Sequence, residues 1–193
     1  MLVPSAVLLG CRCAIGLVFV ASVLGKVRGR EAYVEFIRAA GRLGPDWVTS
    51  RIPARMVAGG VIAAEAAVVV LLVLPATAWA GFGLAALLAV GFVAAIRAAL
   101  RRGDRAPCNC FGVSARPVGR LHLVRNTVLA AIAGLGLATG AVSAGPVETA
   151  GVVAAVVAGV VVAAVVVRAD DLADLFRPVV PASGDRERKG LHR

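Results

Sequence analysis

The sequence predicts an all-α integral membrane protein. Hydrophobic residues make up 60% of the 193 residues, and the mean hydropathy of +0.88 is too high for a chain of this length to fold around one soluble core. Long apolar runs follow one another along the chain, without the alternation of polar and apolar residues that a membrane β-barrel requires. Because backbone hydrogen bonds in lipid must be satisfied within each segment, we expect these runs to be helices.

Five apolar runs are candidates for membrane-spanning helices. Four contain windows of about 19 apolar residues, long enough to cross roughly 30 Å of hydrocarbon, and the run near residue 122 is shorter and begins with polar residues. We expect one domain over residues 1–142 and an additional spanning helix within residues 143–168. The spans expected in the first domain are residues 3–24, 56–74, 77–96 and 122–142.

The first apolar run differs from a secretory signal peptide. It has no basic region before it, and Arg12 lies inside it. We therefore expect this run to stay in the protein as its first span.

Two segments outside the spans have their own patterns. After the first span, apolar residues at helical spacing predict a short helix over about residues 30–44 that lies along the membrane surface. Residues 169–193 mix acidic residues, prolines and basic residues, which predicts a solvated and partly disordered tail.

The cationic residues predict the orientation of the chain in its membrane. The formal net charge is +10, and 19 of the 21 cationic residues lie in segments 26–55, 97–120 and 168–193. The segments expected on the opposite side carry none, so the N-terminus is expected outside and the basic segments in the cytoplasm. The charge is then explained by the anionic lipid bilayer as a partner, and no nucleic acid is expected. The composition is typical of a GC-rich bacterium, which makes the bacterial plasma membrane the expected location.

Ionisable side chains inside the spans are expected to have partners or functions, because each costs roughly 2.5 to 3.5 kcal/mol in hydrocarbon. Arg12 and Glu65 lie at similar distances from the outer ends of two neighbouring antiparallel spans. We therefore expect an Arg12–Glu65 ion pair in the bundle interior. Such a pair either fixes the register of the two helices or belongs to a site for a proton or a quinone.

Arg125 and Asn126 lie one or two turns inside the start of the fourth span. One interpretation is that Arg125 extends its charged end to the membrane surface. The other is that Arg125 lowers the pKa of a nearby cysteine thiol, because an adjacent cation favours the reactive thiolate.

Four cysteines form two Cys-x-Cys pairs. Cys11 and Cys13 lie on a helix, where residues two apart point to nearly opposite faces, so they are expected to be small apolar side chains within the bundle. Cys108 and Cys110 lie between Pro107 and Gly112, which favours a turn. A disulfide closed over one intervening residue is strained and therefore easily exchanged. Thiol–disulfide exchange and a purely structural pair both fit this turn.

A metal is not expected at the Cys108 and Cys110 turn. Zinc needs about four ligands, and only His122 and Asp104 could join the two thiolates, without the usual paired spacing. No other cofactor is evident from the sequence.

Several short segments together resemble the MauE family of methylamine utilisation membrane proteins, which is related to DoxX. The resemblance covers about residues 8–138, and its most specific part is Cys108-Asn109-Cys110-Phe111-Gly112, where Asn109 takes a place more often held by Gly. The other segments that carry it are Gly25-Lys26-Val27-Arg28, the stretch from Tyr33 to Pro45, Glu65, and Val124-Arg125-Asn126. The resemblance implies a DoxX-like four-helix transmembrane bundle, to which the fifth helix is an addition.

The resemblance also implies a role in one-carbon metabolism. It implies a membrane protein needed for processing, transport or maturation of a client, such as the disulfide-rich small subunit of methylamine dehydrogenase. Cys108 and Cys110 are carried over as the candidate redox pair, with Lys26, Glu65, Arg125 and Asn126 as matching polar positions. Lys26, Glu65 and Asn126 are expected inside the membrane, as is Arg12. By analogy with membrane disulfide oxidoreductases alone, the pair exchanges electrons with a quinone or another thiol redox partner.

Two functions remain open at this point. In one, the protein is a membrane thiol–disulfide oxidoreductase. In the other, it is a non-enzymatic assembly or transport factor in which the Cys-x-Cys turn is structural. The predicted orientation bears on the first function, because it puts the two thiols in the cytoplasm, where thiols are normally kept reduced.

Overall fold

The computed structural model describes residues 3–44, 46–103, 119–142 and 148–175. Across these residues the backbone forms helices and no strand, which confirms the predicted all-α class. The helices, in chain order, are α1 (Val3–Val27), α2 (Arg30–Leu43), α3 (Asp46–Thr49), α4 (Ala54–Val73), the 3-10 helix η1 (Pro75–Thr77), α5 (Ala78–Arg101), α6 (Arg120–Val142), α7 (Thr149–Val167) and α8 (Ala169–Leu175).

Five of the described helices are long and apolar enough to cross a membrane, namely α1, α4, α5, α6 and α7. They correspond to the five predicted spans. The third span is longer than expected, because α5 continues to Arg101. The shorter run with polar residues at its start is a full helix, α6, from Arg120 to Val142.

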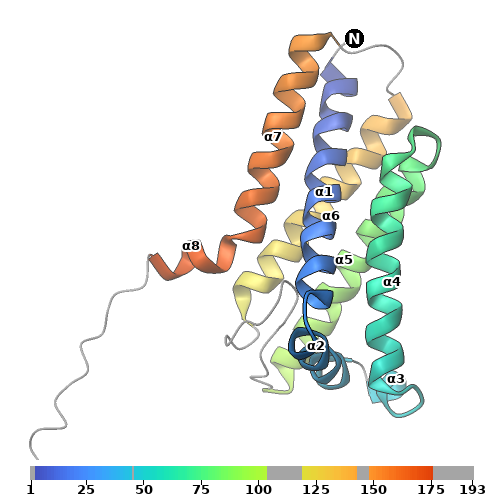
Figure 1. Ribbon diagram of the computed structural model, residues 1–193, viewed down its shortest axis with the longest axis vertical. Coiled ribbons are helices and arrows are strands. Elements are labelled where there is room, and N and C mark those ends of the chain that lie inside the picture. Colours follow the sequence, from blue (N-terminus) through green and yellow to red (C-terminus); the bar gives the residue numbers. More distant parts are fainter. Residues whose placement is uncertain (1–2, 45, 104–118, 143–147, 176–193) are drawn as a thin grey trace, which may run out of the picture.

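The described parts of the basic segments gather at one end of the bundle. Figure 1 shows the N-terminus of α1 and the η1 turn at one end, and α2, α3, the last turns of α5 and the first turns of α6 at the other. We call this second end the basic end. The grouping agrees with the charge pattern of the sequence, and the cytoplasmic location of the basic end stays a prediction.

Helix α1 lies at the centre of the bundle, in contact with α4, α6 and α7, while α5 packs between α4 and α6 (Figure 1). The largest core cluster is built on these helices and contains Ile15 and Val18 of α1, Val68 of α4, Phe82 of α5 and Leu129 of α6. In lipid, helices associate mainly through close packing, because the surrounding hydrocarbon is as apolar as the core.

Two glycines permit helix approaches that a larger residue would prevent. A Cβ added at Gly159 of α7 would lie 2.7 Å from the Cβ of Cys13 and 2.8 Å from the carbonyl oxygen of Gly10 in α1. A Cβ at Gly136 of α6 would overlap the ring of Phe82. The tight α1–α7 contact involves a helix that the MauE resemblance did not reach.

The predicted surface helix is present as α2, between Gly29 and Gly44. Its buried residues Ala32, Phe36 and Ala39 lie on the side toward the bundle, and α2 contacts α1, α4 and α5. Helix α2 therefore covers the basic end of three spanning helices.

The segment predicted as a disordered tail begins with a helix. Residues Ala169–Leu175 form α8, which contacts α6 and α7. The rest of the predicted tail, residues 176–193, lies outside the described residues.

Candidate functional site

Buried polar side chains are concentrated in the half of the bundle nearer the basic end. A buried ion or amide in lipid requires partners, so their contacts decide what this region can do. The buried polar or charged residues among those described are Ser22, Lys26, Glu65, His122, Arg125 and Asn126.

Lys26 of α1 and Glu65 of α4 form an ion pair inside the bundle. The ammonium of Lys26 lies 2.7 Å from each carboxylate oxygen of Glu65, and both side chains are 1% exposed. Breaking such a pair by removing one partner costs about 3 to 5 kcal/mol, because the other charge stays buried alone. The pair therefore holds α1 and α4 in one register.

Ser22 and Phe36 complete the surroundings of the Lys26 ammonium. Lys26 donates a hydrogen bond of 2.6 Å to the hydroxyl of Ser22, one turn earlier on α1. Ser22 in turn donates to Glu65 Oε1 at 3.2 Å. The ammonium also lies 4.9 Å from the ring centroid of Phe36 on α2, a cation–π contact. The ion pair thus connects α1, α2 and α4.

Asn126 of α6 faces the same region through a small cavity. Ser22, Glu65 and Asn126 line this cavity together with apolar residues of α1, α5 and α6, and its volume of about 20 Å³ is enough for one water molecule. The amide of Asn126 donates to the carbonyl oxygen of His122 at 2.8 Å. We refer to Ser22, Lys26, Glu65 and Asn126 as the buried polar cluster.

Arg125 points to the neighbouring helix α8. Its guanidinium is 3.4 Å from Asp170 Oδ2, and the two side chains are 3% and 23% exposed. The contact joins the first turns of α6 to α8 at the basic end. The proposed effect of Arg125 on a cysteine thiol remains a prediction, because Cys108 and Cys110 lie outside the described residues.

The predicted Arg12–Glu65 ion pair is wrong. Arg12 donates from Nε to the carbonyl oxygen of Leu72 and from Nη2 to that of Val73, each at 2.9 Å. These carbonyls end α4, where a cation is favoured. Glu65 lies seven residues earlier on α4, about 10 Å along the helix at 1.5 Å per residue. Arg12 and Glu65 were expected at the same depth because they lie at similar distances from the ends of their apolar runs. Their depths in the bundle differ by about two helical turns.

Lys26 lies inside the bundle, as expected of a matching polar position in the membrane, although it also begins the basic segment 26–55. Side chains of a helix tilt toward its N-terminus, so the ammonium of Lys26 reaches back by one turn to the level of Ser22. Ser22 was missed altogether. The signal was present in the sequence, because Ser22 lies four residues before Lys26 and on the same helix face.

Cys11 and Cys13 are free thiols on α1, as expected from their spacing. Cys11 belongs to the core cluster, and Cys13 packs against Gly159 of α7. Both therefore serve as small side chains in helix packing.

Comparison with known proteins relates the chain to one family. The family model described as "Methylamine utilisation protein MauE" matches residues 4–139. A protein of Paracoccus denitrificans named "Methylamine utilization protein MauE" is 37% identical over 150 residues, which are 76% of this chain and 76% of the relative. No solved structure matches the chain. Helices α7 and α8 follow the residues matched by the family model.

Proposed function

Because the chain belongs to the MauE family of methylamine utilisation proteins, we propose that it is a membrane factor that exchanges thiols and disulfides with a client protein during maturation of that client. The proposed exchange centre is the pair Cys108 and Cys110. The proposed client class is an exported, disulfide-rich subunit such as the small subunit of methylamine dehydrogenase. Because the predicted orientation puts the pair in the cytoplasm, the proposed exchange prepares the client before its export.

This proposal is supported by one observation: matching polar residues of the resemblance lie close together in the bundle. Lys26 binds Glu65, and Glu65 and Asn126 line one cavity. Arg125, the fourth of these residues, is next to Asn126 in α6. The connection that contains both cysteines follows α5 and precedes α6, and both of these helix ends belong to the basic end. This arrangement supports a functional region near the basic end.

One round of exchange that starts from a Cys108–Cys110 disulfide balances without an external oxidant. A client thiolate attacks one sulfur of a Cys108–Cys110 disulfide, which breaks that bond, forms a mixed disulfide and releases a cysteine thiolate that takes up a proton. A second client thiolate then attacks the mixed disulfide, so the client gains a disulfide and Cys108 and Cys110 remain as two thiols. Net oxidation of further clients requires an acceptor of two electrons and two protons, and a membrane quinone is the proposed acceptor, by analogy alone.

Serine substitutions test this function. Cys108→Ser and Cys110→Ser should each stop formation of disulfides in the client, while the level of the variant in the membrane stays unchanged. Cys13→Ser is the matched control, since Cys13 packs against α7 and is expected to leave client maturation intact. The measurement is the amount of disulfide-bonded methylamine dehydrogenase small subunit in cells that make both proteins. Normal maturation with either serine variant would contradict the proposal.

Labelling with a membrane-impermeant thiol reagent tests where the pair works. If the basic end is cytoplasmic, Cys108 and Cys110 should react in opened vesicles and not in intact cells. Labelling only after treatment with a reductant would indicate that the pair forms a disulfide.

A non-enzymatic assembly factor is the second candidate function. It is favoured by the burial of the polar cluster, since Lys26 and Glu65 are each 1% exposed and are satisfied by each other. In that case the cluster only fixes helix positions, and both serine variants should support normal client maturation.

A further inference from the structure

We propose that the groove between α2, α4 and α5 binds one acyl chain of an anionic phospholipid, whose headgroup lies at the basic end beside Arg42 and Arg102. This inference is independent of the thiol chemistry proposed above. The groove has a volume of about 240 Å³, and its walls include Phe36 and Leu43 of α2, Val57 and Val61 of α4, and Gly91 and Phe92 of α5.

The walls of the groove suit a hydrocarbon chain. Each side chain that lines it belongs to Phe, Leu, Val, Ile, Ala or Gly, and none of these can donate or accept a hydrogen bond. A ligand with a polar ring, such as a quinone, would leave its oxygens without side-chain partners at this place. Leu87, at one margin of the groove, is 69% exposed. The groove therefore opens onto the surface that faces the lipid, from which an acyl chain can enter.

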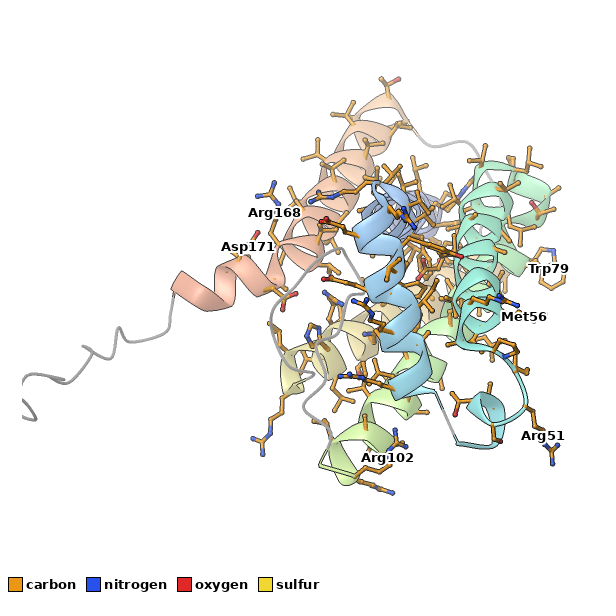
Figure 2. The ribbon with its side chains drawn as sticks, turned by 60° about the horizontal axis from the view of Figure 1, so that its bottom comes forward. Arg51, Met56, Trp79, Arg102, Arg168 and Asp171 are labelled. Atoms are coloured by element: carbon orange, nitrogen blue, oxygen red, sulfur yellow. The ribbon has the colours of Figure 1, made fainter. Side chains whose placement is uncertain are left out.

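Positive charge lies where the headgroup would be. Arg102 caps the end of α5, and its guanidinium donates to the carbonyl oxygen of Arg42 at 3.3 Å. Arg42 directly precedes Leu43 and Gly44, which both line the groove. Figure 2 brings the basic end forward and shows Arg102 at the tip of α5, well apart from Arg51. Arg42 and Arg102 are both exposed at this end of the groove, and a cation near an anionic headgroup contributes roughly a fivefold gain in binding.

The groove also touches the buried polar cluster through one side chain. Phe36 lines the groove, and the ammonium of Lys26 lies 4.9 Å from its ring centroid. A chain in the groove would hold the Phe36 ring in place. Lipid binding should therefore stabilise the arrangement around Lys26 and Glu65.

Lipid retention by the purified full-length protein tests the proposal. The protein is exchanged into detergent with equal amounts of phosphatidylglycerol and phosphatidylcholine, and the retained lipid is counted by native mass spectrometry. We expect one tightly retained phosphatidylglycerol per chain. Arg42→Gln and Arg102→Gln should each lower the preference for phosphatidylglycerol roughly fivefold, whereas Arg51→Gln should not change it.

Filling the groove gives a second test with a matched control on the same helix. A Cβ at Gly91 meets no atom within 4 Å, and Gly91 lines the groove, so the side chain of Gly91→Leu begins in open space at the groove. Gly83 of α5 is equally uncrowded and does not line the groove. Gly83→Leu is therefore the control, because it makes the same glycine-to-leucine change on the same helix outside the groove. Gly91→Leu should abolish lipid retention, and Gly83→Leu should keep it.

Three results would overturn the proposal. Equal retention of phosphatidylglycerol and phosphatidylcholine by the unchanged protein would contradict headgroup binding by the two arginines. Unchanged lipid retention by Gly91→Leu would show that the lipid binds outside the groove. A co-purified quinone that Gly91→Leu displaces would identify a different occupant.

Discussion

The ammonium of Lys26 contacts both carboxylate oxygens of Glu65 at 2.7 Å, and this pair joins α1 to α4 in the interior of the bundle. Two opposite charges thus share one nearly water-free place, with Ser22 bonded to both of them. The contribution of the Lys26–Glu65 pair to the free energy of unfolding can be measured by removing the two charges singly and together.

Removal of one charge should destabilise the protein strongly. Glu65→Gln and Lys26→Met should each lower the free energy of unfolding by about 3 to 5 kcal/mol, because one buried charge is left alone. The double variant Lys26→Met/Glu65→Leu removes both charges and should recover most of that loss. The measurement is denaturant-induced unfolding in detergent micelles. Glu31→Gln, at an exposed position in the first turn of α2, is the control and should change the free energy by at most about 1 kcal/mol. Equal losses in the single and double variants would contradict the pair's role.

Arg12 and Glu65 should act independently. Arg12→Gln removes the donors to the last carbonyls of α4, while Glu65→Gln acts on Lys26. Their effects on the unfolding free energy should add within about 0.5 kcal/mol. If the effect of the double variant differs from the sum of the single effects by clearly more than this value, Arg12 and Glu65 interact, and the independence of the two residues is wrong.

The approach of α7 to α1 should be sensitive to one methyl group. Gly159→Ala puts a Cβ at 2.7 Å from the Cβ of Cys13 and 2.8 Å from a backbone oxygen of α1. Since the backbone cannot yield without moving a helix, we expect a loss of about 1 to 3 kcal/mol. Gly134→Ala on α6 is the control, because its Cβ meets nothing within 4 Å and alanine favours helix by up to about 1 kcal/mol. The measurement is the free energy of unfolding in detergent micelles, with resistance to proteolysis beside it. If both are unchanged in Gly159→Ala, the added methyl group fits between the helices without cost, which contradicts the prediction.

The contact between Arg125 and Asp170 should hold α8 against α6. Asp170→Asn should raise amide hydrogen exchange across Ala169–Leu175 with a small effect on global stability, because Asp170 is partly exposed. Arg168→Gln, at an exposed neighbouring position, should leave this exchange unchanged. Equal exchange in all three proteins would mean that α8 is held by other contacts.

The fold class and the five spans follow directly from composition and apolar run length, because lipid leaves the backbone few alternatives to helix. Helix α2 was also predictable, since apolar residues such as Phe36 and Leu43 recur at helical spacing between charged ones. The first turns of the tail were not, because the acidic residues of α8 suggested a solvated segment until Asp170 was found beside Arg125.

The candidate site could be predicted only in part. Glu65 was recognised from its position in an apolar run, but its partner depends on the register of α1 against α4, which run lengths do not determine. The long side chain of Lys26 adds a further turn of reach. Asn126 was singled out by resemblance, whereas its meeting with Glu65 at one cavity depends on how α6 packs against the other helices.

The separation of Lys26 and Glu65 along the chain has a consequence for synthesis in the cell. The two residues are 39 positions apart, and a ribosome needs roughly 2 to 8 s to add that many residues. If the spans enter the membrane in chain order, α1 lacks its counter-charge during this interval, and we expect the Lys26 ammonium to stay at the water boundary until α4 arrives. A chain arrested between the two spans should then present an unburied Lys26.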